Sequence, residues 1–138
     1  MDKVLLDTDI LSEIFKGKND SIITRAMNYR SQYGYFTTSV ITMMEMVKGF
    51  QKIQREDALK KLLTALKGTE ILTFEREAAK ITGRIFGDLE RNGQPVGRSD
   101  PMIAGIAIAH DLALITGNLS HYQRIQNFGY PLRLDDWH

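Results

Sequence analysis

Three acidic residues stand where an expected strand or helix meets a loop, and together they could bind one metal ion. Each adjoins an apolar segment: Asp7 follows residues 4–6, Glu45 follows residues 39–42, and Asp100 precedes residues 101–104. At a separation of ~4 Å and an effective dielectric constant of ~20, each pair of like charges costs roughly 4 kcal/mol. A bound divalent cation would more than reverse that repulsion. The pattern therefore predicts an acidic, metal-binding pocket.

Residues beside these acids are further candidates for the same pocket. Asp9 lies two positions after Asp7, and two acids on either side of Thr8 are a poor way to make a single helix cap. This arrangement favours chemistry over capping. Arg98, two positions before Asp100, either contacts a phosphate or offsets the local negative charge, and the sequence leaves both interpretations open.

Each acid also has a structural explanation that needs no chemistry. Asp7 can cap a helix, Glu45 can be a solvated residue on an amphipathic helix, and Asp100 followed by Pro101 is a favourable helix start. For Asp100 the two explanations are compatible, because a carboxylate that accepts a backbone N–H is held in place and stays ionised. For Glu45 the methionines that surround it in the sequence argue against a fully solvated position.

Short apolar runs alternate with helical patterns along the chain. They predict strands over residues 4–6, 35–38, 70–73, 112–116 and 130–134, with Pro131 marking the last strand as an edge. Alternating strands and helices indicate an α/β domain with a parallel sheet and right-handed crossovers. In such sheets ligands bind beyond the carboxyl ends of the strands, where Asp7, the region of Glu45 and residues 116–118 are expected.

The helices between these strands are predicted from caps and from the spacing of apolar residues. Ser39, Thr73 and Asp100 are expected N-caps, with Pro101 in the first turn after Asp100 and Gly68 capping the helix over 58–67. The inward faces of three of the helices are predicted to carry Ile22, Ile23, Ala26 and Met27; Met43, Met46, Phe50 and Ile53; and Leu59, Leu62, Leu63 and Leu66.

Composition narrows the class of protein. The 138 residues, 43% hydrophobic and 25% charged, predict one domain over residues 1–138. A net charge of +1 gives no global field, so nucleic-acid binding requires a local basic patch. The absence of cysteine excludes thiolate catalysis and Cys-based zinc sites, and it is compatible with a cytoplasmic location. The longest apolar stretch, residues 102–109, is far below the ~20 residues that span a bilayer, so no membrane association is expected.

Several separated segments resemble, in the right order, the PIN-domain nucleases, and specifically the VapC-type ribonuclease toxins of toxin–antitoxin pairs. The matching segments are VLLDTDI (4–10), TSVITMME (38–45), GQPVG (93–97) leading to DPMIAG (100–105), LITGN (114–118) and DDW (135–137). The resemblance therefore covers nearly the whole chain.

The resemblance implies a three-layer α/β/α fold with a mainly parallel sheet. It implies Mg²⁺, with Mn²⁺ as the alternative, held by Asp7, Glu45 and Asp100. It also implies endoribonuclease activity on RNA such as tRNA, a cognate VapB-like antitoxin and a homodimer. Asp7 and Asp100 are assigned as principal ligands, and Glu45 as a ligand through water or as the residue that orients the attacking water. Supporting roles are assigned to Thr8, Asp9, Ser39, Asn118 and His121.

Two positions depart from the family pattern. Asp9 stands where the family commonly has Asn, which adds negative charge to the pocket. His121 stands at the fourth acidic position, which leaves open whether one or two metal ions bind. Asn118 would then hold the attacking water or the hydration shell of the ion.

The function predicted from these residues is metal-assisted hydrolysis of RNA phosphodiester bonds. Two alternatives remain. Asp7 and Asp9 also fit the Asp-x-Asp nucleophile loop of haloacid-dehalogenase-like phosphatases, although a convincing match to that class's second metal segment is missing. With His121 marking a weakened site, the same fold could instead serve as an RNA- or protein-binding module.

Overall fold

A parallel sheet forms the centre of the computed structural model, which describes residues 2–94 and 99–138. Within these residues the strands are β1 (Val4–Leu6), β2 (Thr37–Ser39), β3 (Glu70–Leu72), β4 (Ala113–Ile115) and β5 (Leu134–Asp135). They are ordered β3-β2-β1-β4-β5, and every neighbouring pair is parallel. The predicted parallel sheet is therefore confirmed, with β5 at an edge. The predicted bounds of that last strand are wrong, because β5 begins only at Leu134 and Pro131 lies outside it. Arg98 lies outside the described residues.

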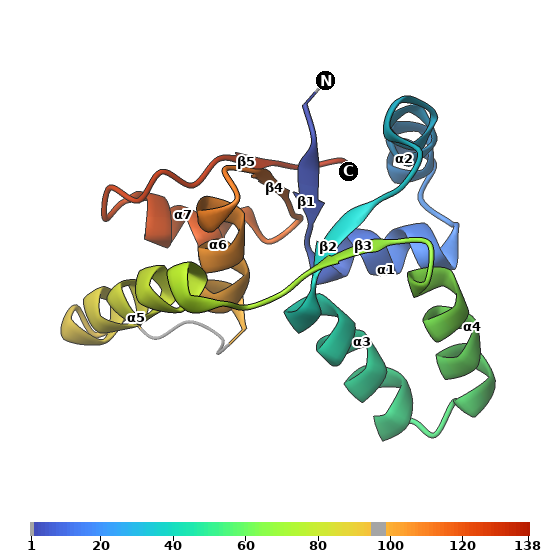
Figure 1. Ribbon diagram of the computed structural model, residues 1–138, viewed down its shortest axis with the longest axis horizontal. Coiled ribbons are helices and arrows are strands. Elements are labelled where there is room, and N and C mark those ends of the chain that lie inside the picture. Colours follow the sequence, from blue (N-terminus) through green and yellow to red (C-terminus); the bar gives the residue numbers. More distant parts are fainter. Residues whose placement is uncertain (1, 95–98) are drawn as a thin grey trace.

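Helices cover both faces of this sheet. They are α1 (Thr8–Lys16), α2 (Asp20–Tyr33), α3 (Val40–Lys52), α4 (Glu56–Leu66), α5 (Arg76–Arg91), α6 (Asp100–Ala109) and α7 (Leu119–Gln126). Figure 1 shows α1 to α4 on one side of the strands and α5 to α7 on the other. This arrangement confirms the predicted three-layer α/β/α fold. No helix in the described ranges is both long and apolar enough to cross a membrane.

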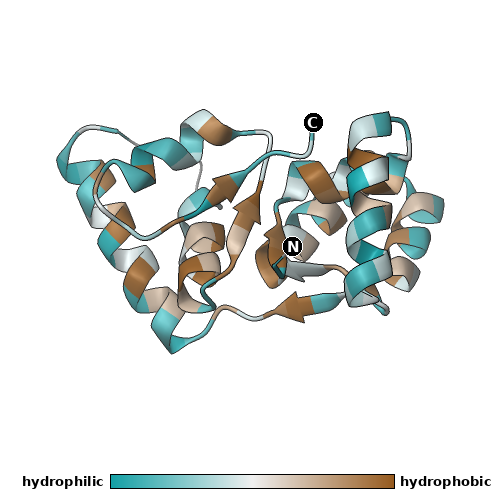
Figure 2. Cartoon of the chain, turned by 90° about the horizontal axis from the view of Figure 1, so that it is seen from above, coloured by the Kyte–Doolittle hydropathy of each residue, from teal (hydrophilic) through white to brown (hydrophobic). Residues whose placement is uncertain are grey.

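The strand β1 divides the core into two halves. Val4 and Leu6 pack into the cluster built with α1, α2 and α4, whereas Leu5 packs into the cluster built with α5, α6 and α7. Neighbouring residues of a strand point to opposite faces, so a strand buried on both faces must be apolar at every position. The apolar strands run through the middle of the molecule in Figure 2.

Some details of the helix predictions are wrong. Met27, Ile53 and Leu63 are 67%, 61% and 42% exposed, although their spacing predicted burial. In α2 the fully buried Tyr29 takes the inward position instead and stacks on Tyr33, and Ile53 lies just beyond the end of α3. Tertiary neighbours, which the spacing of one helix does not contain, decide how wide its buried face is.

The caps of α5 and α6 also differ from the prediction. The helix α5 starts at Arg76 with Glu75, not Thr73, at the N-cap. Asp100 is the first residue of α6, and Ser99 is the N-cap because its carbonyl accepts the N–H bonds of Met102 and Ile103. Lys67, not Gly68, is the C-cap of α4. By contrast, the Ser39 hydroxyl caps α3 as predicted, accepting from the Thr42 N–H at 3.0 Å.

The register of the sheet brings three strand ends together. Leu6 in β1 lies opposite Thr38 in β2 and opposite Ile115 in β4. The residues that follow these partners therefore meet at one edge of the sheet, although more than 100 positions separate the first from the last in sequence. This edge is where the candidate site lies.

Candidate active site

Asp7 stands at the carboxyl end of β1 and is only 4% exposed. Its Oδ1 accepts the Thr8 N–H at 2.9 Å, and its Oδ2 accepts the Thr116 hydroxyl at 2.8 Å. Asp7 is also the N-cap of α1. Asp7 thus caps a helix and also lies in the pocket. Its carboxylate is fixed from two sides.

The groups around the Asp7 carboxylate compensate its negative charge poorly. Burial raises the pKa of Asp7 to about 7, against the hydrogen bonds from Thr116 and Thr8, which lower it. The negative charges of Asp9 and Asp100 raise this pKa further. A buried carboxylate with acidic neighbours gains free energy from a proton or a metal cation.

Asp100 faces the same pocket from the start of α6. Its Oδ2 lies 3.3 Å from Nδ1 of His121, and its Oδ1 lies 3.4 Å from the Tyr122 hydroxyl. Burial raises the pKa of Asp100, the His121 side chain opposes that shift, and the charge of Glu45 adds to it. Asp100 therefore interacts electrostatically with both Asp7 and Glu45, and the fold brings the three acids into one region.

Glu45 is tied to this region by a chain of hydroxyl groups. The Thr8 hydroxyl donates to Glu45 Oε1 at 2.6 Å and lies 3.0 Å from the Thr42 hydroxyl. The Ser39 hydroxyl, which caps α3, lies 3.4 Å from the same Thr42 oxygen. Thr8 thus touches an acid directly, whereas Ser39 reaches the acids only through intermediate residues.

Asp9 and Asn118 lie around the end of β4. Asp9 Oδ2 accepts the Gly117 N–H at 2.7 Å, and a Cβ atom on Gly117 would stand only 2.5 Å from that oxygen. The Asn118 N–H donates to the Thr116 hydroxyl at 3.0 Å, while the Asn118 side chain is exposed. Among the described residues the buried Asp9 Oδ1 has no hydrogen-bond partner. Asp9 therefore joins the start of α1 to the end of β4.

Two polar residues of the site, Thr42 and Tyr122, were not predicted from the sequence, and Thr116 was expected at the strand end without a role. Thr42 and Thr116 are fully buried and bind Thr8 and Asp7, respectively. Tyr122 is also fully buried, and its hydroxyl reaches Asp100. A polar residue directly after a buried strand was a usable signal for Thr116. Nothing local distinguishes Tyr122 from an ordinary core residue of α7.

The donor atoms fit a hard divalent cation, although they are not gathered around one point. In the described part of the chain, no three Asp, Glu or His side chains are close enough together to hold an ion as they stand. Equally, no lysine or arginine among those residues forms a salt bridge with Asp7, Glu45 or Asp100. Carboxylate oxygens are the ligands that Mg²⁺ and Mn²⁺ prefer.

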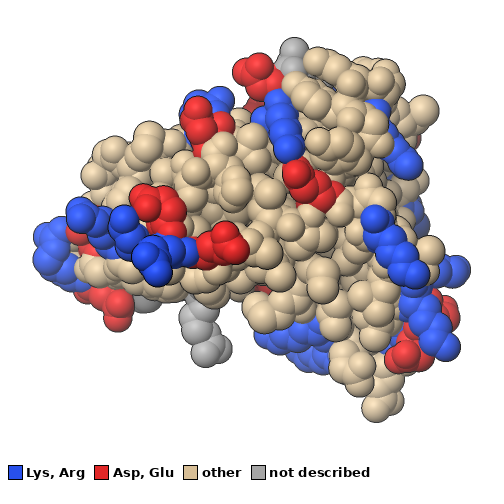
Figure 3. All heavy atoms as spheres, viewed as in Figure 1, with Lys and Arg blue, Asp and Glu red and all other residues tan. Residues whose placement is uncertain are grey.

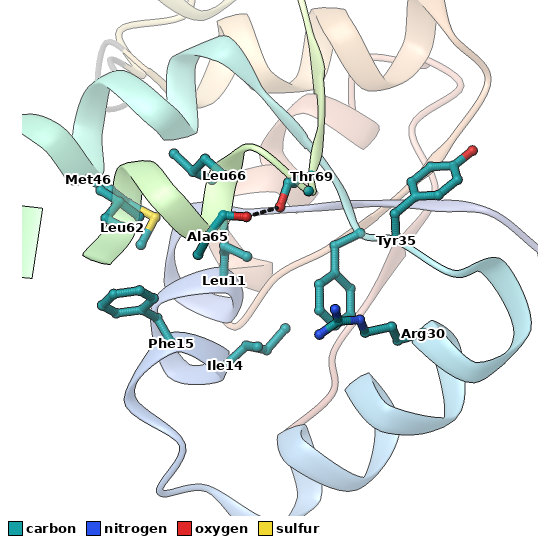
Figure 4. Close-up of a pocket in the computed structure, with 12 residues that line it drawn as sticks. Leu11, Ile14, Phe15, Arg30, Tyr35, Met46, Leu62, Ala65, Leu66 and Thr69 are labelled. Atoms are coloured by element: carbon teal, nitrogen blue, oxygen red, sulfur yellow. Dashed lines mark hydrogen bonds between the residues drawn. The ribbon is translucent and has the colours of Figure 1, made fainter. Parts of the chain in front are cut away.

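An apolar groove adjoins the acids. It has a volume of about 270 Å³ and is lined by Thr8 and Glu45 together with Phe15, Phe50 and Ile53. Phe15 and Met46 also line a second cavity of about 280 Å³ between α1, α2 and α4, which we call the inner pocket. Figure 4 shows this inner pocket, where apolar side chains of α1 and α4 face each other. An apolar surface thus runs from the acids toward α4.

Basic residues do not form one continuous face in the view of Figure 3. Blue spheres gather toward both ends of the molecule, near α5 and near α4, with red spheres among them. Some of these charges are paired within their own segment, as in Arg91 with Asp88 and Arg55 with Asp57. This distribution agrees with the net charge of +1.

Comparison with known proteins identifies the family of this chain. The family model described as the PIN domain matches residues 4–125. The tRNA(fMet)-specific endonuclease VapC of Shigella flexneri is 33% identical over 139 residues, which cover 98% of each chain. Ribonuclease VapC1 of Rickettsia felis is 29% identical and covers 89% of this chain and 90% of its own.

Solved structures agree with these sequence matches. A crystal structure of VapBC2 from Rickettsia felis, bound to a DNA fragment from its promoter, superposes with a TM-score of 0.83 at 25% identity, covering 99% of this chain and 100% of its own. DNA-bound VapBC from Salmonella typhimurium has a TM-score of 0.77 at 34% identity and covers 100% of both chains. The similarity therefore extends over the full length of the chain.

Proposed function

Because this chain belongs to the PIN-domain family, we propose that it is an RNA-cleaving endonuclease and the toxin of a toxin–antitoxin pair. The observation that carries the proposal is that Asp7, Asp100 and Glu45 lie in one region at the carboxyl ends of the strands, with Asp7 held by Thr8 and Thr116, and Glu45 held by Thr8. The family match leaves the phosphatase alternative without support.

We further propose that the site works with Mg²⁺, or with Mn²⁺ in its place. A bound divalent ion would lower the pKa of a water molecule and stabilise the charge that builds on the phosphoryl oxygens. Asp7 and Asp100 would bind the ion. The donor set supports this assignment, because it consists of carboxylate oxygens and has no lysine or arginine partner among the described residues.

Glu45 is suited to orient the attacking water. Thr8 holds its Oε1 at 2.6 Å, and Oε2 makes no hydrogen bond to any described residue. A carboxylate fixed through one oxygen can accept a proton or a hydrogen bond from water at the other. Thr8 is in turn held by Thr42, so the geometry of Glu45 depends on both hydroxyl groups.

The substrate proposed is RNA, and tRNA in particular, because relatives carry that specificity in their names. His121 lies at the exposed rim of the pocket beside Asp100, where it can orient this carboxylate or contact a phosphate when protonated. The proposed phosphate contact of Arg98 falls outside the described residues.

The partner proposed is a VapB-like antitoxin, since similar chains occur in VapBC structures. The apolar groove supports this proposal, because it combines the partly buried Phe15 and Phe50 and the exposed Ile53 with Thr8 and Glu45 of the site. A partner segment that fills the groove would cover part of the acidic pocket. The homodimer stays a prediction.

Replacing Asp7 tests the proposed function. Asp7→Asn keeps the size of the side chain and removes its charge, so we expect a folded protein whose RNA cleavage falls by more than the ~100-fold that loss of a supporting residue typically costs. The measurement is cleavage of total tRNA by antitoxin-free protein in Mn²⁺, in Mg²⁺ and in EDTA.

Asp111→Asn is the matched control, because Asp111 is exposed and far from the strand ends that hold the site. Its positive φ of 53° is one that Asn adopts readily. Full metal-dependent cleavage by Asp7→Asn would refute the assignment. RNA binding that is the same with and without the ions, with no cleavage by the unaltered protein, would favour the binding-module alternative.

A further inference from the structure

Tyr122 places a hydroxyl group inside the acidic pocket. It belongs to α7, is 0% exposed, and lies 3.4 Å from Asp100 Oδ1. Burial raises the pKa of Tyr122 well above its ordinary range, and the charges of Asp7 and Asp100 raise it further. The hydroxyl donates toward the Asp100 carboxylate.

Packing of the Tyr122 ring does not require its hydroxyl group. The ring of Tyr122 lies in the core cluster that Leu114 and Ile125 also form, and a phenylalanine would fill the same space. The hydroxyl adds only a polar atom, which is costly to bury without partners. Its partner is the Asp100 carboxylate on α6, which is assigned as a principal metal ligand and which the tertiary fold brings beside α7.

We propose that Tyr122 is a positioning residue that orients the Asp100 carboxylate, so that Asp100 is in place when a divalent ion binds. This inference rests on the proposed function. A carboxylate oxygen has two lone pairs, so it can accept a hydrogen bond from the hydroxyl and still face a metal ion. Groups that hold ligands from behind typically change metal affinity by 10–100-fold when they are removed.

The separation of 3.4 Å also fits this role. It is long for an O–H···O hydrogen bond, which is usually 2.5–3.0 Å. Such contacts often tighten when the site is filled. The hydroxyl thus lies close enough to orient the carboxylate without fixing it in a position that excludes the ion.

The test measures Mn²⁺ binding directly, by titration calorimetry without RNA. Tyr122→Phe removes the hydroxyl and keeps the ring, and we expect its dissociation constant for Mn²⁺ to rise by about 10–100-fold. Tyr130→Phe is the matched control, because it removes a tyrosine hydroxyl that donates to the Asp88 carboxylate at 2.6 Å, away from the pocket. Its affinity for Mn²⁺ should equal that of the unaltered protein.

Cleavage provides a second readout that a purely structural role would not move. Tyr122→Phe should cleave RNA poorly at limiting Mn²⁺ and recover the rate of the unaltered protein at saturating Mn²⁺. Thermal unfolding in EDTA establishes that the variant is folded. A Tyr122→Phe variant with unchanged Mn²⁺ affinity overturns the inference and leaves the proposed function intact. Failure of the unaltered protein to bind Mn²⁺ overturns both.

A measurement on the unaltered chain keeps the inference testable if the variant does not fold. Mn²⁺ binding should change the ultraviolet absorption of a buried tyrosine, because the carboxylate beside its hydroxyl then shares its charge with the ion. The same difference spectrum should appear in Tyr130→Phe. Binding without any tyrosine difference spectrum contradicts the inference.

Discussion

At the scale of single residues, Asp7 combines a structural role with the chemical role proposed for it. Its carboxylate caps α1 through the Thr8 N–H and also accepts the Thr116 hydroxyl, so both oxygens are oriented. Burial beside Asp9 and Asp100 makes the charged form unfavourable without a cation. The residue is therefore held in a state that metal binding would relieve, and its protonation should affect stability.

We expect Asp7 to lower the stability of the metal-free protein as the pH rises. The pKa of Asp7 is about 7 in the folded protein and 3.8 as the ordinary value, so the folded state holds this proton more tightly than the unfolded state. The stabilisation from this group is complete below about pH 4 and is lost as the pH rises to about 7. The difference corresponds to about 4 kcal/mol at most.

Comparison of Asp7→Asn with the unaltered chain isolates this effect. In EDTA, the variant should unfold at a higher denaturant concentration than the unaltered chain at pH 8, and the difference should shrink toward pH 4. Asp111→Asn should follow the unaltered chain throughout. A difference that does not vary with pH would show that the Asp7 charge does not destabilise the fold.

At the scale of elements, the contact between α5 and α6 determines where Asp100 stands. The Thr82 hydroxyl in α5 donates to the Pro101 carbonyl in the first turn of α6 at 3.0 Å. Gly105 lies against the same helix, where an added Cβ would overlap the Thr82 hydroxyl and stand 2.9 Å from the Ala78 carbonyl oxygen. The small residue lets α6 pack closely, and this close packing brings Asp100 to the pocket.

Gly105→Ala should therefore separate α6 from α5. We expect a loss of about 1–3 kcal/mol in the free energy of unfolding, together with reduced RNA cleavage, because α6 carries Asp100. Gly83→Ala in α5 is the matched control, since nothing lies within 4 Å of its added Cβ. That change should stabilise the protein by about 0.5–1 kcal/mol. Equal effects of the two substitutions on unfolding would contradict the packing argument.

At the scale of the whole molecule, the acids and the apolar surface form one continuous feature. The groove that contains Thr8 and Glu45 shares Phe15 and Met46 with the inner pocket of Figure 4. A partner segment bound along α1 and α3 would therefore touch the proposed site residues and bury apolar surface at once. On the proposal above, one antitoxin segment bound there would provide both affinity and inhibition.

Ile53→Glu tests this use of the groove. Ile53 is exposed and lines the groove, so a charge there should weaken the complex with a cognate VapB-like antitoxin by at least about tenfold, while RNA cleavage by the free protein stays unchanged. Leu63→Glu is the matched control, because Leu63 is also exposed but does not line the groove. The measurement is titration of each purified variant with the antitoxin. Equal affinities for the two variants would place the antitoxin elsewhere.

The sequence by itself determined the local features of this protein. The apolar strand β1, the Ser39 cap, and the positions of Asp7, Glu45 and Asp100 beside apolar segments follow from neighbours within a few residues. Such features depend on propensity, capping and periodicity, which short stretches of sequence contain. The parallel sheet followed from the alternation of strands and helices.

Only the tertiary structure decided which residues surround the acids. Pairing of Leu6 with Ile115 brings Thr116 to Asp7 across 109 positions, and packing of α7 beneath α6 brings the Tyr122 hydroxyl to Asp100. The exposure of Met27 and Ile53 was likewise decided by neighbouring elements. Sheet register and helix packing bring together segments that are distant in sequence. The residues that orient a site therefore depend on long-range contacts, which a local sequence pattern does not show.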